Sequence, residues 1–266
     1  MTRAVFINPN SRARVYQNLD TAIEPPVWCR ILAGHARDNG FDVSIVDAEA
    51  EGLELNQVTD RCRGADLAVI VAFGHQPSAA TQTMPAAYDL CAAIDEPTLL
   101  VGGHVSALPR RTLEESGADY VCNGEGPETV AGLLSGAKDI PGLVWAGGEN
   151  KPAPLMDMVA LHGNVWDLLP MDRYRAHNWQ GFGWPRQPYA SIHTSLGCPY
   201  KCAFCCINAP FHANRYRMRD PSEVVAEIKA LISRYGVRTF KIVDEMFVLN
   251  DRHYTAICEG LAGENI

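Results

Sequence analysis

The sequence predicts an α/β protein whose first half forms a flavodoxin-like, doubly wound parallel sheet. The first observation is that short runs rich in Val, Ile and Leu alternate with segments of helical apolar spacing. The second is that these runs are almost continuously apolar, which is typical of parallel strands buried on both faces. The third is that 266 residues, 47% apolar and 20% charged, are enough for one or two packed domains.

Five buried strands and the helices between them are expected in the first half. The strands are expected at 4–9, 42–48, 66–74, 97–104 and 119–126. The helices are expected at 25–40, 54–64, 78–95 and 106–117. Right-handed crossovers then give the strand order 2-1-3-4-5. Ligands of such sheets bind at the carboxyl ends of the strands, so we expect a ligand site there.

Glycine-rich turns follow two of these strands. The turns after the fourth and fifth strands supply Gly102, Gly103, His104 and Ser106, then Gly124, Glu125 and Gly126. Glycines let a ligand approach the backbone, and helix amino-termini favour anions such as phosphate. An ordinary strand-to-helix turn is the alternative. No G-x-G-x-x-G follows the first strand, so a dinucleotide site of the NAD kind is not expected.

The net charge and the apolar runs of the sequence indicate which classes of partner and which cellular compartment to expect. Lys plus Arg is 23 and Asp plus Glu is 31, which gives a net charge of −8. A general nucleic-acid binder needs a basic face, so no nucleic-acid partner is expected. The amino-terminus lacks the apolar stretch of a signal peptide, and no apolar run reaches about 18 residues. We therefore expect a cytoplasmic protein without a membrane partner. In that reducing compartment, clustered cysteines are expected to be metal ligands or catalytic thiols rather than disulfides.

Four of the nine cysteines lie within residues 198–206. Cys198, Cys202 and Cys205 follow the spacing C-x-x-x-C-x-x-C, and three such thiolates can ligate three irons of a [4Fe–4S] cluster, leaving the fourth iron open. Cys206 offers an alternative third ligand, but we favour Cys205 because Phe204 precedes it. Zinc is the competing metal, although it usually requires a second cysteine pair or histidines.

The remaining chain predicts a hairpin, a linker and the start of a (β/α) barrel. A hairpin is expected to turn at Gly147-Gly148, and a Trp- and Pro-rich linker follows it. A β–α–β unit is expected over 190–243, as at the start of a barrel. From Tyr189 only 78 residues remain, whereas a barrel needs roughly 200. We therefore expect an incomplete barrel.

The expected organisation has three parts. They are a ligand-binding sheet domain at 1–136, the hairpin and linker at 137–188, and the barrel start at 189–266.

The cysteine loop carries a resemblance to a known family. The segment GCPYKCAFC (197–205) resembles the cluster signature of the radical S-adenosylmethionine enzymes. Residues 101–130 are similar to the cobalamin-binding domain that precedes the barrel in one large class of them, and residues 240–250 to that class's second barrel strand. The chain lacks a D-x-H-x-x-G motif, as that class commonly does, and has Leu196 where an Arg often stands. The resemblance covers nearly the whole chain.

The resemblance implies three cofactors and their contacts. The open iron would chelate S-adenosylmethionine, with Phe204 near its adenine and Asp244 and Glu245 facing its ammonium group. Cobalamin would bind at the two glycine-rich turns. A solvated turn is the alternative for the acidic pair.

The resemblance also implies a reaction. A one-electron donor such as flavodoxin or ferredoxin would reduce the cluster, a 5′-deoxyadenosyl radical would abstract a substrate hydrogen, and methylcobalamin would deliver a methyl group. The expected function is a methyltransferase acting on an unactivated carbon of a small molecule or natural product, and this chain alone is expected to be inactive. The alternatives are a cyclase or rearrangement enzyme of the same class, and a non-catalytic cobalamin- or iron–sulfur-binding module.

The other cysteines and histidines are weaker candidates. Cys29, Cys62 and Cys91 fall on expected helices, so a second cluster is not expected. Cys122 and Cys258 are expected to be core thiols, and His193 a core histidine on a strand. His75 and His104 lie at strand ends that face the expected ligand.

Overall fold

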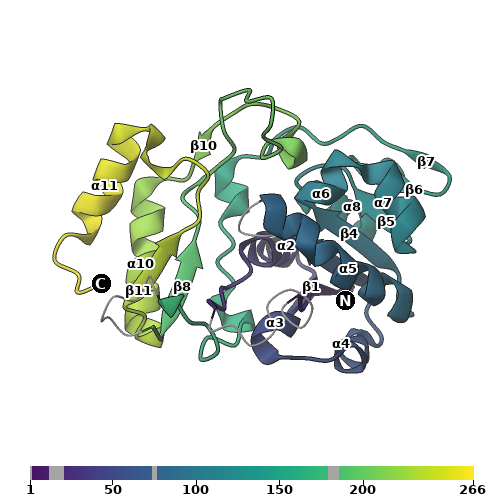
Figure 1. Ribbon diagram of the computed structural model, residues 1–266, viewed down its shortest axis with the longest axis horizontal. Helices are drawn as coiled ribbons and strands as arrows, with labels where there is room; N and C mark the ends of the chain where they lie inside the picture. The colour runs from purple at the N-terminus through teal and green to yellow at the C-terminus, as the bar shows by residue number, and fades with distance from the viewer. Residues whose placement is uncertain (1, 12–20, 74–76, 179–185) are drawn as a thin grey trace.

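The computed structural model describes residues 2–11, 21–73, 77–178 and 186–266 (Figure 1). A seven-stranded sheet with helices on both faces occupies one side, and a two-stranded parallel sheet with two helices lies beside it. In Figure 1 the smaller sheet and its helices run from green to yellow at the left of the large sheet.

The large sheet confirms the expected topology. Its strands are β1 Arg3–Asn8, β2 Asp42–Asp47, β3 Leu67–Ala72, β4 Thr98–Gly102, β5 Tyr120–Cys122, β6 Leu143–Trp145 and β7 Gly148–Glu149. The order is β2-β1-β3-β4-β5-β6-β7, and the first five strands pair in parallel as expected. The hairpin β6–β7 forms where Gly147-Gly148 predicted it. It adds antiparallel to β5, so the sheet runs past residue 136.

The helices cover both faces of this sheet. They are α2 Val27–Asp38, α3 Ala48–Glu51, α4 Leu55–Cys62, α5 Pro77–Ala93, α6 Gly103–Ala107, α7 Pro109–Ser116 and α8 Pro127–Ser135. Side chains alternate between the faces of each strand. Accordingly Phe6 packs in the core under α2 and α8, whereas Val5 and Ile7 pack in the core under α4, α5 and α7.

Three expected elements had wrong boundaries at the ligand-facing edge. The fourth strand ends at Gly102 rather than residue 104, because α6 begins at Gly103. The helix expected at 106–117 is divided into α6 and α7, since Pro109 starts a new helix at its first position. The fifth strand ends at Cys122, so the Gly124–Gly126 turn lies outside the sheet.

The carboxyl-terminal part contains the expected β–α–β unit. It consists of β8 Tyr189–Ile192, α10 Pro221–Tyr235, β11 Thr239–Ile242 and α11 Asp251–Leu261, and β8 pairs in parallel with β11. Asp220 caps α10 by accepting a hydrogen bond from the Ser222 amide at 2.7 Å, and Gly236 ends the helix in a left-handed conformation. Between β8 and α10, β9 Ser195–Leu196 pairs antiparallel with β10 Arg217–Met218.

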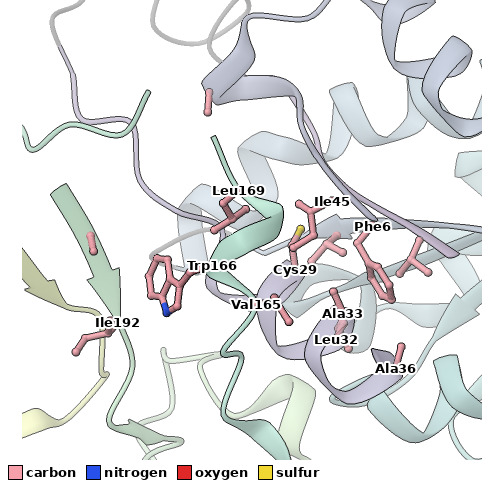
Figure 2. Packing of buried hydrophobic residues seen from close by; sticks show 14 of the residues in the cluster. Phe6, Cys29, Leu32, Ala33, Ala36, Ile45, Val165, Trp166, Leu169 and Ile192 are labelled. Carbon is pink, nitrogen blue, oxygen red and sulfur yellow. The ribbon is translucent and has the colours of Figure 1, made fainter. Parts of the chain in front are cut away.

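One hydrophobic core connects the two sheets. The linker contains two short 3-10 helices, η1 Met158–Leu161 and η2 Trp166–Leu168. Trp166 and Leu169 belong to the same buried cluster as Cys29 of α2 and Ile192 of β8, and Figure 2 shows them between these elements. The linker therefore packs across the junction, as its composition predicted. Among the described residues, no helix is long and apolar enough to cross a membrane.

Candidate functional site

A cavity of about 410 Å³ lies between the carboxyl edge of the large sheet and the cysteine loop. Gly103 and His104 of α6 line one wall. Cys206 and the acidic pair Asp244 and Glu245, which follows β11, line the opposite wall. The cavity therefore joins residues that the sequence assigned to cobalamin with residues that it assigned to S-adenosylmethionine.

The two glycines after β4 have different roles. A Cβ atom on Gly102 would lie 2.4 Å from the carbonyl oxygen of Ala72 on the neighbouring strand, so this position accepts only glycine. A Cβ atom on Gly103 would meet nothing within 4 Å, and Gly103 borders the cavity. Gly102 thus allows close strand packing, whereas Gly103 leaves its backbone open to a ligand.

The turn after β5 is tied to the start of α6. The buried Ser106 hydroxyl bridges the turns, because it accepts from the Gly124 amide at 3.2 Å and lies 3.2 Å from the Gly124 carbonyl oxygen. Gly124 has φ +147° with open space where a Cβ would be, while Gly126 at φ +104° packs against Leu32 and Val101. Gly124 is nevertheless buried and borders a separate cavity of about 10 Å³, so of the two glycine-rich turns only the one after β4 lines the main cavity.

Glu125 has a protein partner rather than a free carboxylate. It is 7% exposed and accepts hydrogen bonds from Arg217 and from the Met156 amide. The structure therefore places this predicted cobalamin residue in an ion pair between the turn after β5 and β10. Sequence reasoning missed Arg217.

Three aromatic rings form a wall of the cavity that the sequence did not predict. Trp28 of α2 stacks on Phe73 at the end of β3, with ring centroids 4.3 Å apart and planes 14° apart. Phe211, in the 3-10 helix η3 Ala209–Phe211, lies 6.1 Å from Trp28. These rings come from three distant segments, so no local pattern could have grouped them.

The carboxylate of Asp244 is fully engaged by the loop after β8. It accepts hydrogen bonds from the Thr194 amide at 2.6 Å, the Thr194 hydroxyl at 2.5 Å and the Ser195 hydroxyl at 2.6 Å. His253 of α11 donates from Nε2 to the Thr194 hydroxyl at 3.1 Å, since that hydroxyl gives its own proton to Asp244. Asp244 therefore holds the end of β11 to the strand that leads into the cysteine loop.

Glu245 is the better candidate for an incoming cation. It accepts from the Gly197 amide at 3.2 Å and lines the cavity. Burial is the main cause that raises its pKa, and nearby Asp244 raises it further. A ligand ammonium placed beside Glu245 would offset the cost of keeping this carboxylate ionised.

The cysteine loop presents free thiols. Cys198 is half-buried, Cys202, Cys205 and Cys206 are exposed, and none is in a disulfide. Asn208 ties the start of the loop, because its amide group exchanges two hydrogen bonds with the backbone of Cys198 at 2.8 and 3.0 Å.

Gly197 allows the chain to enter this loop. A Cβ there would lie 2.2 Å from the Arg215 carbonyl oxygen, and its φ is +81°. Only glycine fits at the position directly before Cys198.

The donor set fits an iron–sulfur cluster in its chemistry, since three unpaired thiols lie within eight residues of one loop. In the described part of the chain, no three His, Cys, Asp or Glu side chains already converge as a metal site. Phe204 is 93% exposed and does not line the cavity. The roles of Phe204 and the three cysteines stay predictions.

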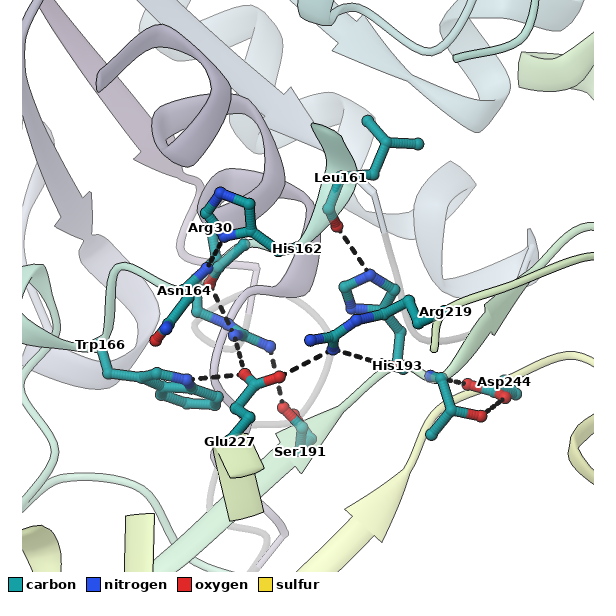
Figure 3. A network of polar contacts seen from close by, with 12 residues as sticks. Arg30, Leu161, His162, Asn164, Trp166, Ser191, His193, Arg219, Glu227 and Asp244 are labelled. Atoms are coloured by element: carbon teal, nitrogen blue, oxygen red, sulfur yellow. Dashed lines mark hydrogen bonds and ion pairs between the residues drawn. The ribbon is translucent and has the colours of Figure 1, made fainter. Parts of the chain in front are cut away.

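A buried polar network joins α2, the linker, β8 and α10 (Figure 3). Arg30 of α2 is fully buried, and its guanidinium donates to the carbonyl oxygens of Gly163 and Ser191 at 2.9 and 3.1 Å and lies 3.7 Å from the centre of the Trp166 ring. Burial lowers the pKa of Arg30 to about 10, still well above neutrality. Glu227 of α10 faces this guanidinium at 3.4 Å.

The same carboxylate is held by two further groups. The Trp166 indole donates to Glu227 at 2.8 Å, and Arg219 lies 2.7 Å from its other oxygen. The network was not visible in the sequence, where buried charges have no periodic pattern.

The predictions for the remaining cysteines and histidines agree with the structure at some positions and not at others. Cys29, Cys62, Cys91 and Cys122 are buried, and burial raises the pKa of each thiol. Cys258 is exposed, so its assignment to the core was wrong: α11 buries His253 and Ile257, and the next residue lies about 100° around the helix. His193 is buried and donates to the Leu161 carbonyl at 2.9 Å, as expected for a core histidine. His75 lies outside the described residues.

Known proteins match both parts of the chain. The family model of the B12 binding domain matches residues 20–134. A protein of Pyrococcus horikoshii described as an uncharacterized methyltransferase is 29% identical over 86% of this chain and 50% of its own length. The anaerobic magnesium-protoporphyrin IX monomethyl ester cyclase of Synechocystis is 26% identical over 99% of this chain and 54% of its own. The chain thus spans about half the length of the curated relatives it matches.

A solved structure shows the same fold. The radical S-adenosylmethionine methyltransferase TsrM from Kitasatospora setae superposes on 98% of this chain and 51% of its own, with a TM-score of 0.68 and 20% identity. Residues 20–134 therefore match the B12 binding domain family, and the chain as a whole shares its fold with a radical S-adenosylmethionine methyltransferase.

Proposed function

We propose that this chain is the cofactor-binding part of a cobalamin-dependent radical S-adenosylmethionine methyltransferase. In this proposal residues 1–136 bind cobalamin, residues 189–266 bind the [4Fe–4S] cluster and S-adenosylmethionine, and residues 137–188 join them. The observation that carries the proposal is the cavity, which has Gly103 and His104 on one wall and Glu245 and Cys206 on the other.

The chain's own residues would bind and orient the cofactors. Bound there, these cofactors would supply the radical and methyl-transfer chemistry, which the side chains of the protein do not provide. Cys198, Cys202 and Cys205 would ligate the cluster, and Glu245 would accept the ammonium group of S-adenosylmethionine. Gly103 would leave room for cobalamin.

The aromatic wall and the acidic turn would support this arrangement. Trp28, Phe73 and Phe211 present apolar surface that excludes water from the space between the cofactors. Asp244 would keep the cysteine loop in place through its three hydrogen bonds.

A cyclase of the same class is the second proposal. It is supported by the Synechocystis cyclase, which is similar over 99% of this chain. We further propose a one-electron donor such as flavodoxin or ferredoxin and a small-molecule or natural-product substrate. A reducing compartment such as the cytoplasm suits nine unpaired cysteines.

Anaerobic reconstitution tests the proposal. The chain is supplied with iron, sulfide and hydroxocobalamin, desalted, and assayed for iron, cobalt and absorption. The proposal expects about four irons and one cobalamin per chain. Cobalamin without iron would instead indicate a binding module, and failure to retain cobalamin would refute the proposal.

Product analysis separates the two activities. The protein that contains this chain is incubated with S-adenosylmethionine, a reductant and extracts of candidate substrates. S-adenosylhomocysteine together with 5′-deoxyadenosine supports methyl transfer, because the methyl group must leave S-adenosylmethionine. 5′-Deoxyadenosine alone supports the cyclase proposal.

A further inference from the structure

We infer that the ion pair between Arg217 and Glu125 sets the spacing of the two cavity walls, so that a ligand bound to one wall strengthens ligand binding to the other. Arg217 is thus a positioning residue. The inference rests on the proposed function, because it takes cobalamin and S-adenosylmethionine as the two ligands.

The pair is buried and makes several contacts. The side chains of Arg217 and Glu125 are 12% and 6% exposed. Both terminal nitrogens of Arg217 donate to the Glu125 carboxylate, and Nη1 also donates to the Met156 carbonyl oxygen at 2.8 Å. The Met156 amide in turn donates to Glu125 at 3.2 Å. A buried, multiply bonded pair of this kind fixes the relative position of the segments that carry it.

On one side, Glu125 is connected to the wall assigned to cobalamin. It lies in the turn that contains Gly124, and the Gly124 amide donates to the Ser106 hydroxyl of α6 at 3.2 Å. The same short helix carries Gly103 and His104, which line the cavity. A ligand against Gly103 therefore contacts α6, and Ser106 of α6 is hydrogen-bonded to the turn that holds Glu125.

On the other side, Arg217 is connected to the wall assigned to the cluster and S-adenosylmethionine. Arg217 of β10 pairs with Leu196 of β9, and Leu196 directly precedes Gly197 in the chain. Gly197 leads into Cys198 and donates its amide to Glu245. The guanidinium also lies 5.3 Å from the centre of the Phe211 ring, which lines the cavity.

The electrostatics agree with this geometry. The pKa of Glu245 is raised chiefly by burial, and the charge of Arg217 acts in the opposite direction. Arg217 therefore influences a carboxylate on one wall while its own partner belongs to the other. Neither Arg217 nor Glu125 lines the cavity itself, so the coupling would pass from each ligand through the hydrogen-bonded segments that carry the pair.

The test measures coupling rather than affinity alone. The dissociation constant of hydroxocobalamin is determined for the anaerobically reconstituted chain with and without saturating S-adenosylmethionine. We expect S-adenosylmethionine to tighten hydroxocobalamin binding by about five-fold or more. By linkage, hydroxocobalamin should tighten S-adenosylmethionine binding by the same factor. Thermal unfolding of each variant checks that it is folded.

Variants then identify the pair as the connection. Arg217→Met combined with Glu125→Gln removes both charges, so no buried charge is left without a partner, and the coupling factor should fall to within two-fold of one. Arg217→Lys should restore part of it, because the positive charge returns without the two-pronged geometry.

The control is Arg37→Met. Arg37 forms an ion pair with Asp167 at 2.8 Å that also joins α2 to the linker. It lies nine residues beyond Trp28, roughly 13 Å along the helix, so coupling should be unchanged.

Two results would overturn the inference. One is a wild-type chain that binds both ligands with a coupling factor of one, which would leave the proposed function intact. The other is a folded double variant that keeps the wild-type factor. If the wild-type chain binds neither ligand, the inference and the proposed function both fail.

Discussion

Arg30 on α2 and Glu227 on α10 form a buried ion pair of 3.4 Å across 197 positions of sequence. Their side chains are 0% and 4% exposed. The pair joins α2, which packs on the large sheet, to α10, which follows β8 in the chain. Arg219 shares the same carboxylate, so one negative charge compensates two positive ones.

Removing the charge of Glu227 should destabilise the fold strongly. Glu227→Gln keeps the shape and an oxygen for the Trp166 indole but leaves two buried guanidinium groups without a counter-charge. We expect the free energy of unfolding, measured by urea denaturation, to fall by about 3–5 kcal/mol. Glu223→Gln on the exposed face of the same helix should change it by less than about 0.5 kcal/mol. Equal effects of the two variants would contradict the prediction.

Stability should decrease in acid partly because of His193. Burial is the main cause that holds the pKa of His193 well below its ordinary value of 6.5, and the charges of Arg219 and Arg30 lower it further. The folded protein therefore keeps His193 neutral while the unfolded chain takes up a proton below about pH 6.5. Stability from this group is present above that pH and is lost as the pH falls.

The measurement is urea unfolding of wild type and His193→Gln at pH 7.5 and pH 5.5. Between these values wild type should lose about 1.4 kcal/mol more than the variant, since each pH unit below the unfolded pKa is worth about 1.4 kcal/mol. The same loss in both proteins would exclude His193 as a source of the pH dependence.

The sequence could predict the features that arise from local patterns. The order of the first five strands, the hairpin at Gly147-Gly148 and the cap of α10 by Asp220 follow from apolar runs, turn residues and capping chemistry, and the structure has them all. The end of β4 was misplaced, because GGH continues an apolar run although it already begins a helix.

The contacts between distant segments could not be predicted. Arg30 and Glu227 are ordinary helical residues in the sequence, and only the packing of α2 beside β8 buries their charges together. Glu125 looked like a ligand contact because it stands between two glycines, yet Arg217, 92 positions away, takes its carboxylate. Such pairings depend on tertiary geometry. The local pattern of a single sequence does not reveal which distant residues meet.

Replacing each cysteine of the loop by alanine should show which thiols ligate the cluster and that Cys206 does not. Cys198→Ala, Cys202→Ala and Cys205→Ala should each lose most of the bound iron after anaerobic reconstitution, since each removes one of three thiolate ligands. Cys206→Ala should retain it, although Cys206 lines the cavity. Iron per chain and the cluster absorption are the measurements. Full iron loading in Cys202→Ala, or loss confined to Cys206→Ala, would refute the assignment.

Adjacent glycines after β4 should respond in opposite ways to added side chains. In Gly102→Ala the new methyl would lie 2.4 Å from the Ala72 carbonyl oxygen, so β3 and β4 must move apart. We expect Gly102→Ala to lower the free energy of unfolding by about 1–3 kcal/mol, as overpacking does.

In Gly103→Val the side chain meets no protein atom of the described chain within 4 Å of its Cβ, and valine is no worse than glycine inside a helix. The fold should therefore keep its stability, while the side chain occupies space that we assign to cobalamin. We expect the dissociation constant for hydroxocobalamin to rise at least about ten-fold, equivalent to about 1.4 kcal/mol. Urea unfolding and hydroxocobalamin titration of both variants make the comparison. The unfolding data show whether Gly103→Val is folded. If the folded variant binds hydroxocobalamin with wild-type affinity, cobalamin does not bind against this wall.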